Sequence, residues 1–373
     1  MRVVYFTHSL RSCWNHGNAH FLRGVLSELV ARGHDVRVHE PEDSWSLSNL
    51  LKEHGEAGLT DFREAYPELS SRTYRRPEEG AAHAWGADLA IVHEWNDPEL
   101  VAAVGRLRAR GGRFILLFHD THHRAVSAPH EMRAYDLSAY DGVLAFGAAL
   151  ARVYDRWGWR DRVFIWHEAA DTRHFHPPAD DGGREGLVWI GNWGDNERSQ
   201  EIVDFLLRPA LEANLPLDAY GVRYPAEAKR KLAEFGARYR GWLANAAAAR
   251  VFARHLATVH VPRRFYARVL PGIPTIRVFE ALACGIPLVS APWDDCEHLF
   301  RVDQDFLMVR NGKEMARALC DLNHDPELRA TLVRYGLETI NRRHSCSRRV
   351  DELMTIVERI RTPVQERMLE SAA

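Results

Sequence analysis

The stretch VVYFTHSLRSCWNHGNAHFLRGVLSELVARGHDVRVHE, residues 3–40, contains one complete strand–helix–strand unit. VVYFT (3–7) is a short apolar run of the kind found in buried strands. In FLRGVLSELVARGHD (21–35) the apolar residues recur at the i, i+3, i+4 and i+7 spacing of a helix face. Gly33 predicts the end of that helix, and DVRVHE (35–40) predicts the second strand.

The same alternation continues along the chain. Further strand candidates in the first half are DLAIVH (88–93), RFILLF (113–118), GVLAF (142–146) and RVFIW (162–166). The pattern restarts at LVWIG (187–191) and continues through PLDAYG, RYRGW, ATVHV, PLVSA and DFLMV, with helices between. Short apolar strands that alternate with helices predict parallel, doubly wound sheets. The polar segment 45–80 is interpreted as short helices or a long excursion.

A change of composition at DTRHFHPPADDGGREG (171–186) divides these two patterns, because Pro, Gly and Asp dominate it. We therefore expect an α/β chain with two Rossmann-like domains, residues 1–170 and 187–345, joined by a linker at 171–186. Residues 346–373 are expected to form a C-terminal helix and tail, the helix packing back on the N-terminal domain. Parallel sheets bind ligands beyond the carboxyl ends of their strands, so the two domains should face each other across a cleft.

Composition excludes several classes of protein. The 49 basic and 51 acidic residues give a formal charge of −2, which argues against nucleic acid as a partner. The five cysteines include no C-x-x-C pair, so neither a disulfide framework nor a zinc knuckle is expected. No apolar run approaches the ~20 residues of a membrane span. We expect a cytoplasmic protein with no transmembrane segment. Peripheral contact with a membrane is compatible with this composition.

One helix of the second half carries two opposite charges. In PGIPTIRVFEALACGIPLV (271–289), Thr275 and Gly285 predict the helix ends, and Arg277 and Glu280 fall on one face. One interpretation is a surface pair worth a few tenths of a kcal/mol. The other is a ligand site: the helix N-terminus, with Arg263 and Arg264 just upstream, suits a diphosphate, and the carboxylate suits a ribose diol.

Two strand ends of the first half carry candidate acid–base groups. FILLFHDTHH places His119 and Asp120 at the end of a strand, where a base could deprotonate an acceptor hydroxyl. The alternatives are that His119 caps the next helix, or that this pair joins His122 and His123 in a metal site. VHEWNDPEL offers Glu94 as another base or acceptor ligand, although Asp97 and Pro98 also fit a plain helix start.

The first loop supplies two further candidates. Gly17 would let the backbone approach donor phosphates or the acceptor, and Asn18 would contact the acceptor. The alternative is an ordinary helix N-terminus with Asn18 as its cap.

The run IPTIRVFEALACGIPLVSAPW, followed by DFLMVRNGKEMARAL and DPELRATLVRYG, resembles the C-terminal module of GT-B glycosyltransferases. More narrowly it is similar to the branch of spore-maturation glycosyltransferase-like proteins. GNAHFLRGVLSELVARGHDV resembles the first loop and helix of such enzymes, and EAADTRHFHP resembles their linker, which usually has Asn-Gly before a hydrophobic-Asp pair. The resemblance implies metal-independent transfer of a sugar from a nucleotide-diphosphate sugar, the co-substrate, to the hydroxyl of a glycan, lipid or small molecule. It implies no cofactor.

Position by position, the resemblance implies roles for named residues. Glu280 matches the second glutamate of the Glu-x7-Glu motif, which binds the ribose. The amides of Thr275 and Ile276 match those that meet the diphosphate. The loop GNWGDNERS (191–199) matches the phosphate-facing loop and offers Asn192 and Arg198. His119 and Asp120 match a His-Asp pair that the family often has near the transferred sugar.

One position departs from the motif. The first glutamate, which contacts the donor sugar in retaining members, is replaced by Gly272, and Arg277 would take over part of its electrostatic role. Two alternative functions fit the same fold: a nucleotide-sugar 2-epimerase, and a non-catalytic nucleotide-binding interaction protein. The missing carboxylate argues against the first of these and supports the second.

Overall fold

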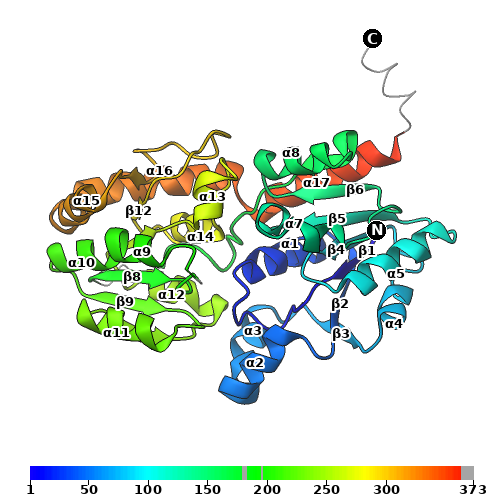
Figure 1. Cartoon of the computed structure of the whole chain (residues 1–373), viewed down its shortest axis with the longest axis horizontal. Coiled ribbons are helices and arrows are strands. Elements are labelled where there is room, and N and C mark those ends of the chain that lie inside the picture. The colour runs from blue at the N-terminus through cyan, green and yellow to red at the C-terminus, as the bar shows by residue number, and fades with distance from the viewer. Residues whose placement is uncertain (179–182, 195, 363–373) are drawn as a thin grey trace, which may run out of the picture.

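The protein is described by a computed structural model that covers residues 1–178, 183–194 and 196–362. Residues 179–182 of the predicted linker and the predicted tail from 363 onward lie outside the described residues. Figure 1 shows two lobes, each built on its own sheet.

The N-terminal lobe is built on parallel strands. Within the described residues, seven of them run in the order β3-β2-β1-β4-β5-β6-β7. They are β1 (Arg2–Phe6), β2 (Asp35–Pro41), β3 (Ser71–Tyr74), β4 (Leu89–His93), β5 (Ile115–Asp120), β6 (Gly142–Ala145) and β7 (Val163–Ile165). All residues of β4 and β5 are buried, which is why these strands are continuous apolar runs in the sequence.

Short helices connect these strands and cover the sheet. They are α1 (Ala19–Ala31), α2 (Trp45–His54), α3 (Thr60–Ala65), α4 (Pro77–Ala82), α5 (Pro98–Ala109), α6 (Arg124–Ser127), α7 (Pro129–Arg133) and α8 (Ala148–Arg156), with 3-10 turns at Gly55–Leu59 and Arg160–Arg162. The predicted strand–helix–strand unit of residues 3–40 is confirmed as β1, α1 and β2. Gly33, at φ +79°, follows the end of α1 as expected.

The C-terminal lobe repeats this plan with a six-stranded parallel sheet, again among the described residues, in the order β10-β9-β8-β11-β12-β13. Its strands are β8 (Leu187–Ile190), β9 (Leu217–Tyr220), β10 (Arg238–Gly241), β11 (Ala257–His260), β12 (Leu288–Ser290) and β13 (Leu307–Met308). Its helices are α9 (Ser199–Ile202), α10 (Arg208–Glu212), α11 (Ala226–Glu234), α12 (Ala248–Phe252), α13 (Arg264–Arg268), α14 (Ile276–Ala283), α15 (Gly312–His324) and α16 (Pro326–Arg343), with a 3-10 turn at Asn245–Ala247.

The last helix, α17 (Cys346–Arg361), packs back on the N-terminal lobe against α1, as predicted (Figure 1). The two helices approach closely at Gly24, where an added Cβ would lie 2.6 Å from the Sγ atom of Cys346. On the outside, Arg32 donates to Asp351 over 2.7 Å. Ala170 forms an isolated β-bridge with Ser345, the residue before α17. This bridge holds the segment before the linker against the start of the last helix.

Direct contacts join the two lobes on the side where the strands end. Asn192 donates to Asn15 over 3.2 Å, and the amide of Asn245 lies 3.2 Å from the Sγ atom of Cys13. After the end of β6, the amide of Ala148 donates to Glu297 over 2.9 Å. The strand order changes direction between β1 and β4, and between β8 and β11 in the other sheet. These are the places where doubly wound sheets bind ligands.

Two expectations from the sequence need correction. Segment 45–80 contains, besides its helices, the edge strand β3, whose residues are mostly polar and therefore give no apolar signal. The first of the helices expected between the strands of the second half is not regular: a π-helical turn at Val203–Leu207 separates α9 from α10. Such turns insert a residue into the helical ladder, which the spacing of apolar residues does not reveal.

Candidate active site

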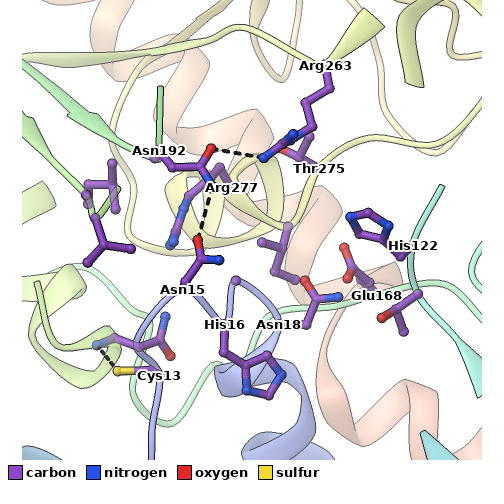
Figure 2. Close-up of a pocket in the computed structure, with 18 of the residues that line it drawn as sticks. Cys13, Asn15, His16, Asn18, His122, Glu168, Asn192, Arg263, Thr275 and Arg277 are labelled. Atoms are coloured by element: carbon purple, nitrogen blue, oxygen red, sulfur yellow. Dashed lines mark hydrogen bonds between the residues drawn. The ribbon is translucent and has the colours of Figure 1, made fainter. Parts of the chain in front are cut away.

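A cavity of about 750 Å³ lies between the two lobes. Its walls follow the carboxyl ends of β1, β4 and β5 on one side and of β8 and β11 on the other. The start of α14 closes it. Figure 2 shows side chains from both lobes around it, including Asn15, Asn18 and His122 from the first and Asn192 and Arg277 from the second.

The C-terminal wall of the cavity carries positive charge from Arg198, Arg263 and Arg277. Arg263 donates to Glu197 over 2.6 Å and to the side-chain oxygen of Asn192 over 3.1 Å. Burial alone would raise the pKa of Glu197, but His123 and Arg263 outweigh it and lower that pKa to about 2. Glu197 is thus ionised, and it orients Arg263 at the cavity edge.

Arg198 is the most buried of the three guanidinium groups. It donates to the carbonyl oxygen of Val261 over 2.8 Å and to that of Asn192 over 3.0 Å, and it lies over the ring of Trp189. Burial lowers the pKa of Arg198 to about 9, so the group stays charged at neutral pH. Since these partners are neutral oxygens, its charge is available to an anion in the cavity.

The first residues of α14 complete this wall. Pro274, Thr275 and Ile276 line the cavity, and Thr275 has the extended backbone of an N-cap, although its side chain makes no capping hydrogen bond. The N-terminus of a helix presents backbone N–H groups and a partial positive charge, which together favour a phosphate.

Glu280 lies behind this wall and does not line the cavity. Its carboxylate accepts from Arg277 and from the Nδ2 group of Asn245, the latter over 3.0 Å, and it contacts the Nδ1 atom of His20 at 2.7 Å. Burial raises the pKa of Glu280, but Arg277 and His20 outweigh it and lower the pKa below its ordinary value. The Arg277–Glu280 pair predicted from their spacing therefore exists, but its carboxylate is fully buried rather than on the surface.

The N-terminal wall is rich in histidine. His8, His16 and His122 line the cavity, and burial lowers the pKa of all three, that of His8 to about 4. These rings are therefore neutral at physiological pH. In the described part of the chain, no group of three or more His, Cys, Asp or Glu residues is arranged to hold a metal ion. Two tryptophans of this wall, Trp45 and Trp95, are exposed.

The predicted pair His119 and Asp120 ends β5, but neither side chain lines the cavity. The hydroxyl of Tyr5 lies 2.7 Å from Nδ1 of His119, and Tyr154 donates to Asp120 over 2.8 Å. Burial lowers the pKa of His119 to about 3 and raises that of Asp120 to about 6. The residues of this strand end that reach the cavity are Thr121, His122 and His123.

Some of the remaining predicted residues line the cavity and others do not. Gly17 and Asn18 line the cavity, whereas Glu94 and Arg264 do not. Glu94 is fully buried and accepts from Arg124, and Arg264 lies outside the cavity and donates to the carbonyl oxygen of Glu197 over 2.9 Å. Of the predicted donor-site residues, Gly17, Asn192, Arg198, Arg263, Thr275, Ile276 and Arg277 are brought together around one space.

Glu168, which was not predicted from the sequence, lines the cavity from the segment between β7 and the linker. Only 3% of this residue is exposed, and its Oε1 atom has no hydrogen-bond partner. Burial raises the pKa of its carboxyl well above the ordinary value, and the charge of Glu280 adds to the rise, whereas Arg277 opposes it. The available signal was EAAD (168–171), which has Glu-Ala where related linkers have Asn-Gly.

Comparison with known proteins supports this architecture. Residues 198–355 match the family model described as glycosyl transferase-like. No curated protein sequence matches the chain significantly. Among the described residues, none of the helices is long and apolar enough to cross a membrane.

Several solved structures share the whole fold. HepE of Anabaena, in complex with UDP and glucose, has a TM-score of 0.69 and 14% identity, and the match covers 96% of this chain and 99% of HepE. Sucrose-phosphate synthase of Thermosynechococcus elongatus has a TM-score of 0.64 and 16% identity, with 100% of both chains covered. An alpha-glucosyltransferase in complex with UDP and DNA has a TM-score of 0.69 and 11% identity, with 96% and 99% covered.

These structures confirm the predicted fold of two doubly wound domains facing across a cleft. The narrower resemblance to the spore-maturation branch stays a prediction. The chain therefore has the GT-B fold, and its residues 198–355 resemble the glycosyl transferase-like family.

Proposed function

We propose that the protein transfers a sugar from a nucleoside-diphosphate sugar to the hydroxyl group of an acceptor. The observation that carries this proposal is the composition of the cavity between the lobes. One wall combines three guanidinium groups with the N-terminus of α14, and the other offers neutral histidines, Asn18 and exposed tryptophans. HepE, which shares this fold, has been solved in complex with UDP and glucose and in complex with UDP-glucose. These complexes support a donor of this class.

The diphosphate is assigned to Arg198, Arg263 and Arg277 with the amides of Thr275 and Ile276. Positive charge at this position stabilises the nucleoside diphosphate as it leaves, because negative charge develops on the bridging oxygen in the transition state. These groups supply the stabilisation without a metal ion, so the proposed reaction is metal-independent and needs no further cofactor. Ribose binding by Glu280 stays a prediction, since this carboxylate lies behind Arg277.

The acceptor is assigned to the N-terminal wall. Asn18 and His122 provide hydrogen-bonding groups there, and Trp95 provides an exposed aromatic ring. The proposed acceptor is a glycan, a lipid or a small molecule with a hydroxyl group. The catalytic roles of His119, Asp120 and Glu94 stay predictions, since their side chains do not line the cavity.

Calorimetric titration with UDP, GDP, ADP and dTDP tests the first step of this proposal. We expect one of the four to bind with measurable heat and with a stoichiometry of about one. Absence of binding by all four would contradict the proposed donor class. Binding without any turnover over a broad panel of donors and acceptors would instead favour a non-catalytic nucleotide-binding protein.

A further inference from the structure

Glu168 is an unusual group to find in the wall of a binding cavity. Its side chain is almost completely buried, and its Oε1 atom has no partner in the protein. Leaving a buried polar atom without a hydrogen bond costs about 1–3 kcal/mol. Such an atom calls for an explanation, and at the wall of a cavity a bound water, ion or ligand supplies one.

The backbone around Glu168 is fixed from several directions. Arg349 of α17 donates to the carbonyl oxygen of His167 over 2.8 Å and to that of Glu168 over 3.3 Å. The amide of Trp166 donates to Ala145 over 2.7 Å, and the amide of Ala170 donates to His344 over 2.9 Å. These hydrogen bonds fix the backbone that carries the Glu168 side chain at the cavity wall.

The groups around this carboxyl locate it within the cavity. Glu168 lines the same cavity as Arg277 of α14, where the diphosphate is assigned, and the charges of Glu280 and Arg277 both act on its carboxyl. Its own charge acts in turn on Tyr266, which also lines the cavity. Figure 2 draws Glu168 and His122 on one side of the cavity and Asn15 and Asn192 on the other.

Position 272 cannot supply a carboxyl group at this place. Gly272 has a φ of +88°, and a Cβ atom there would lie 2.7 Å from Oε1 of Glu297 and 3.1 Å from Sγ of Cys296. Gly272 does not line the cavity, so a side chain at this position would be both strained and directed among its neighbours rather than toward a ligand.

We propose that Glu168 hydrogen-bonds to hydroxyl groups of the donor sugar and is a specificity-determining residue for that sugar. This inference rests on the proposed function. A sugar attached to a diphosphate at α14 would occupy the same cavity, whose wall includes Glu168. Burial raises the pKa of this carboxyl and so favours its protonated form, which can both donate to a sugar oxygen and accept from a sugar hydroxyl.

Two substitutions at this position separate hydrogen bonding from packing. Glu168→Leu removes both the donor and the acceptor at similar volume, whereas Glu168→Gln keeps one of each. Glu185→Gln, at an exposed residue two positions before β8, is the matched control. Circular dichroism and thermal unfolding establish that each variant is folded.

The experiment is calorimetric titration of each variant with UDP and UDP-glucose, and with GDP and GDP-mannose as a second pair. For the pair that the wild type binds, we expect Glu168→Leu to raise the Kd of the sugar nucleotide about 10-fold. It should leave the Kd of the free nucleoside diphosphate within about twofold. Glu168→Gln should retain most of the wild-type affinity for the sugar nucleotide.

The outcomes are distinct. If the wild type binds none of UDP, GDP, ADP and dTDP, the proposed function fails. If it binds one, but Glu168→Leu changes both Kd values equally or changes neither, only the assignment of Glu168 to the donor sugar is overturned. Unchanged donor affinities together with a fall in acceptor affinity alone would overturn that same assignment.

Discussion

The Nδ1 atom of His20, in α1, lies 2.7 Å from Oε1 of Glu280, in α14, and both side chains are completely buried. This contact joins a helix of the first lobe to the helix that begins at the cavity in the second. Glu280 also accepts from Arg277, whose guanidinium faces the cavity, and from Asn245. One buried carboxylate thus links the boundary between the lobes to the charged wall of the site.

Replacement of this carboxylate should destabilise the protein. Glu280→Gln removes the negative charge that compensates Arg277 and alters the contact with His20 in a buried environment. Breaking one partner of a buried ion pair typically costs about 3–5 kcal/mol, so we expect a loss of about 3 kcal/mol in the free energy of unfolding. Urea denaturation at pH 7.5 measures it. The exposed Glu212, in α10, gives the control Glu212→Gln, which should change stability by less than about 0.5 kcal/mol.

Loss of the charge of Arg198 should weaken binding of the diphosphate. Arg198→Gln preserves part of the hydrogen bonding to Val261 and Asn192 but removes the guanidinium charge. A charge-assisted hydrogen bond contributes about 1.5–3 kcal/mol, so we expect the Kd of the nucleoside diphosphate to rise roughly 10- to 100-fold. Calorimetry measures the change, with Arg208→Gln on the outside of α10 as control. An unchanged Kd would place the diphosphate elsewhere.

A side chain at position 272 should be poorly tolerated. Gly272→Ala introduces a Cβ atom that meets Glu297 and Cys296 on a backbone at φ +88°. Gly236, at φ +71° with nothing within 4 Å of its Cβ position, carries the conformational strain without the clash. We expect Gly236→Ala to cost about 1–2 kcal/mol and Gly272→Ala clearly more. Equal losses of stability for the two variants in thermal unfolding would show that Glu297 and Cys296 move aside without a measurable energetic cost.

Acid should destabilise the fold through its buried histidines. His344 donates from Nε2 to Leu299 and accepts at Nδ1 from Arg349, each over 2.8 Å, and burial lowers its pKa to about 3. The unfolded chain binds a proton at this imidazole below about pH 6.5, whereas the native state does not until about pH 3. Its contribution to stability is therefore complete above pH 6.5 and is lost progressively as the pH falls.

The slope of stability against pH measures this effect. Between pH 5.5 and 4.5 the wild type should lose up to about 1.4 kcal/mol per buried histidine. His344→Gln should reduce that slope by the contribution of one buried histidine, up to about 1.4 kcal/mol per pH unit. His324→Gln, at an exposed position of α15, is the control. An identical slope for wild type and His344→Gln in urea titrations would refute the assignment of His344 as a contributor.

The sequence predicted the two sheets well because their strands are buried on both faces. A run such as ILLF in β5 must be apolar throughout when helices cover both sides, and this signal is local. The strand β3 was missed because it is an edge strand of four residues with only Tyr74 buried. Local periodicity carries no information about such a strand, whose position depends on pairing with β2.

The site was predicted less completely, for a related reason. The spacing of Arg277 and Glu280 correctly placed them on one face of α14, but only tertiary contacts with His20 and Asn245 bury the carboxylate. Glu168 reaches the cavity because α17 crosses back and fixes its segment between the lobes. That placement joins residues 181 positions apart, and no local pattern predicts it.

Sugar transfer itself is tested most directly by mass spectrometry of reaction mixtures. The purified protein is incubated with a panel of nucleotide sugars and an extract of host metabolites and glycolipids, alongside Arg198→Gln. We predict that wild-type protein produces an acceptor heavier by one sugar residue, together with the matching nucleoside diphosphate, and that the variant produces much less of both. Tight nucleotide binding by the wild type with no sugar-bearing product from any donor would contradict the assignment as a glycosyltransferase.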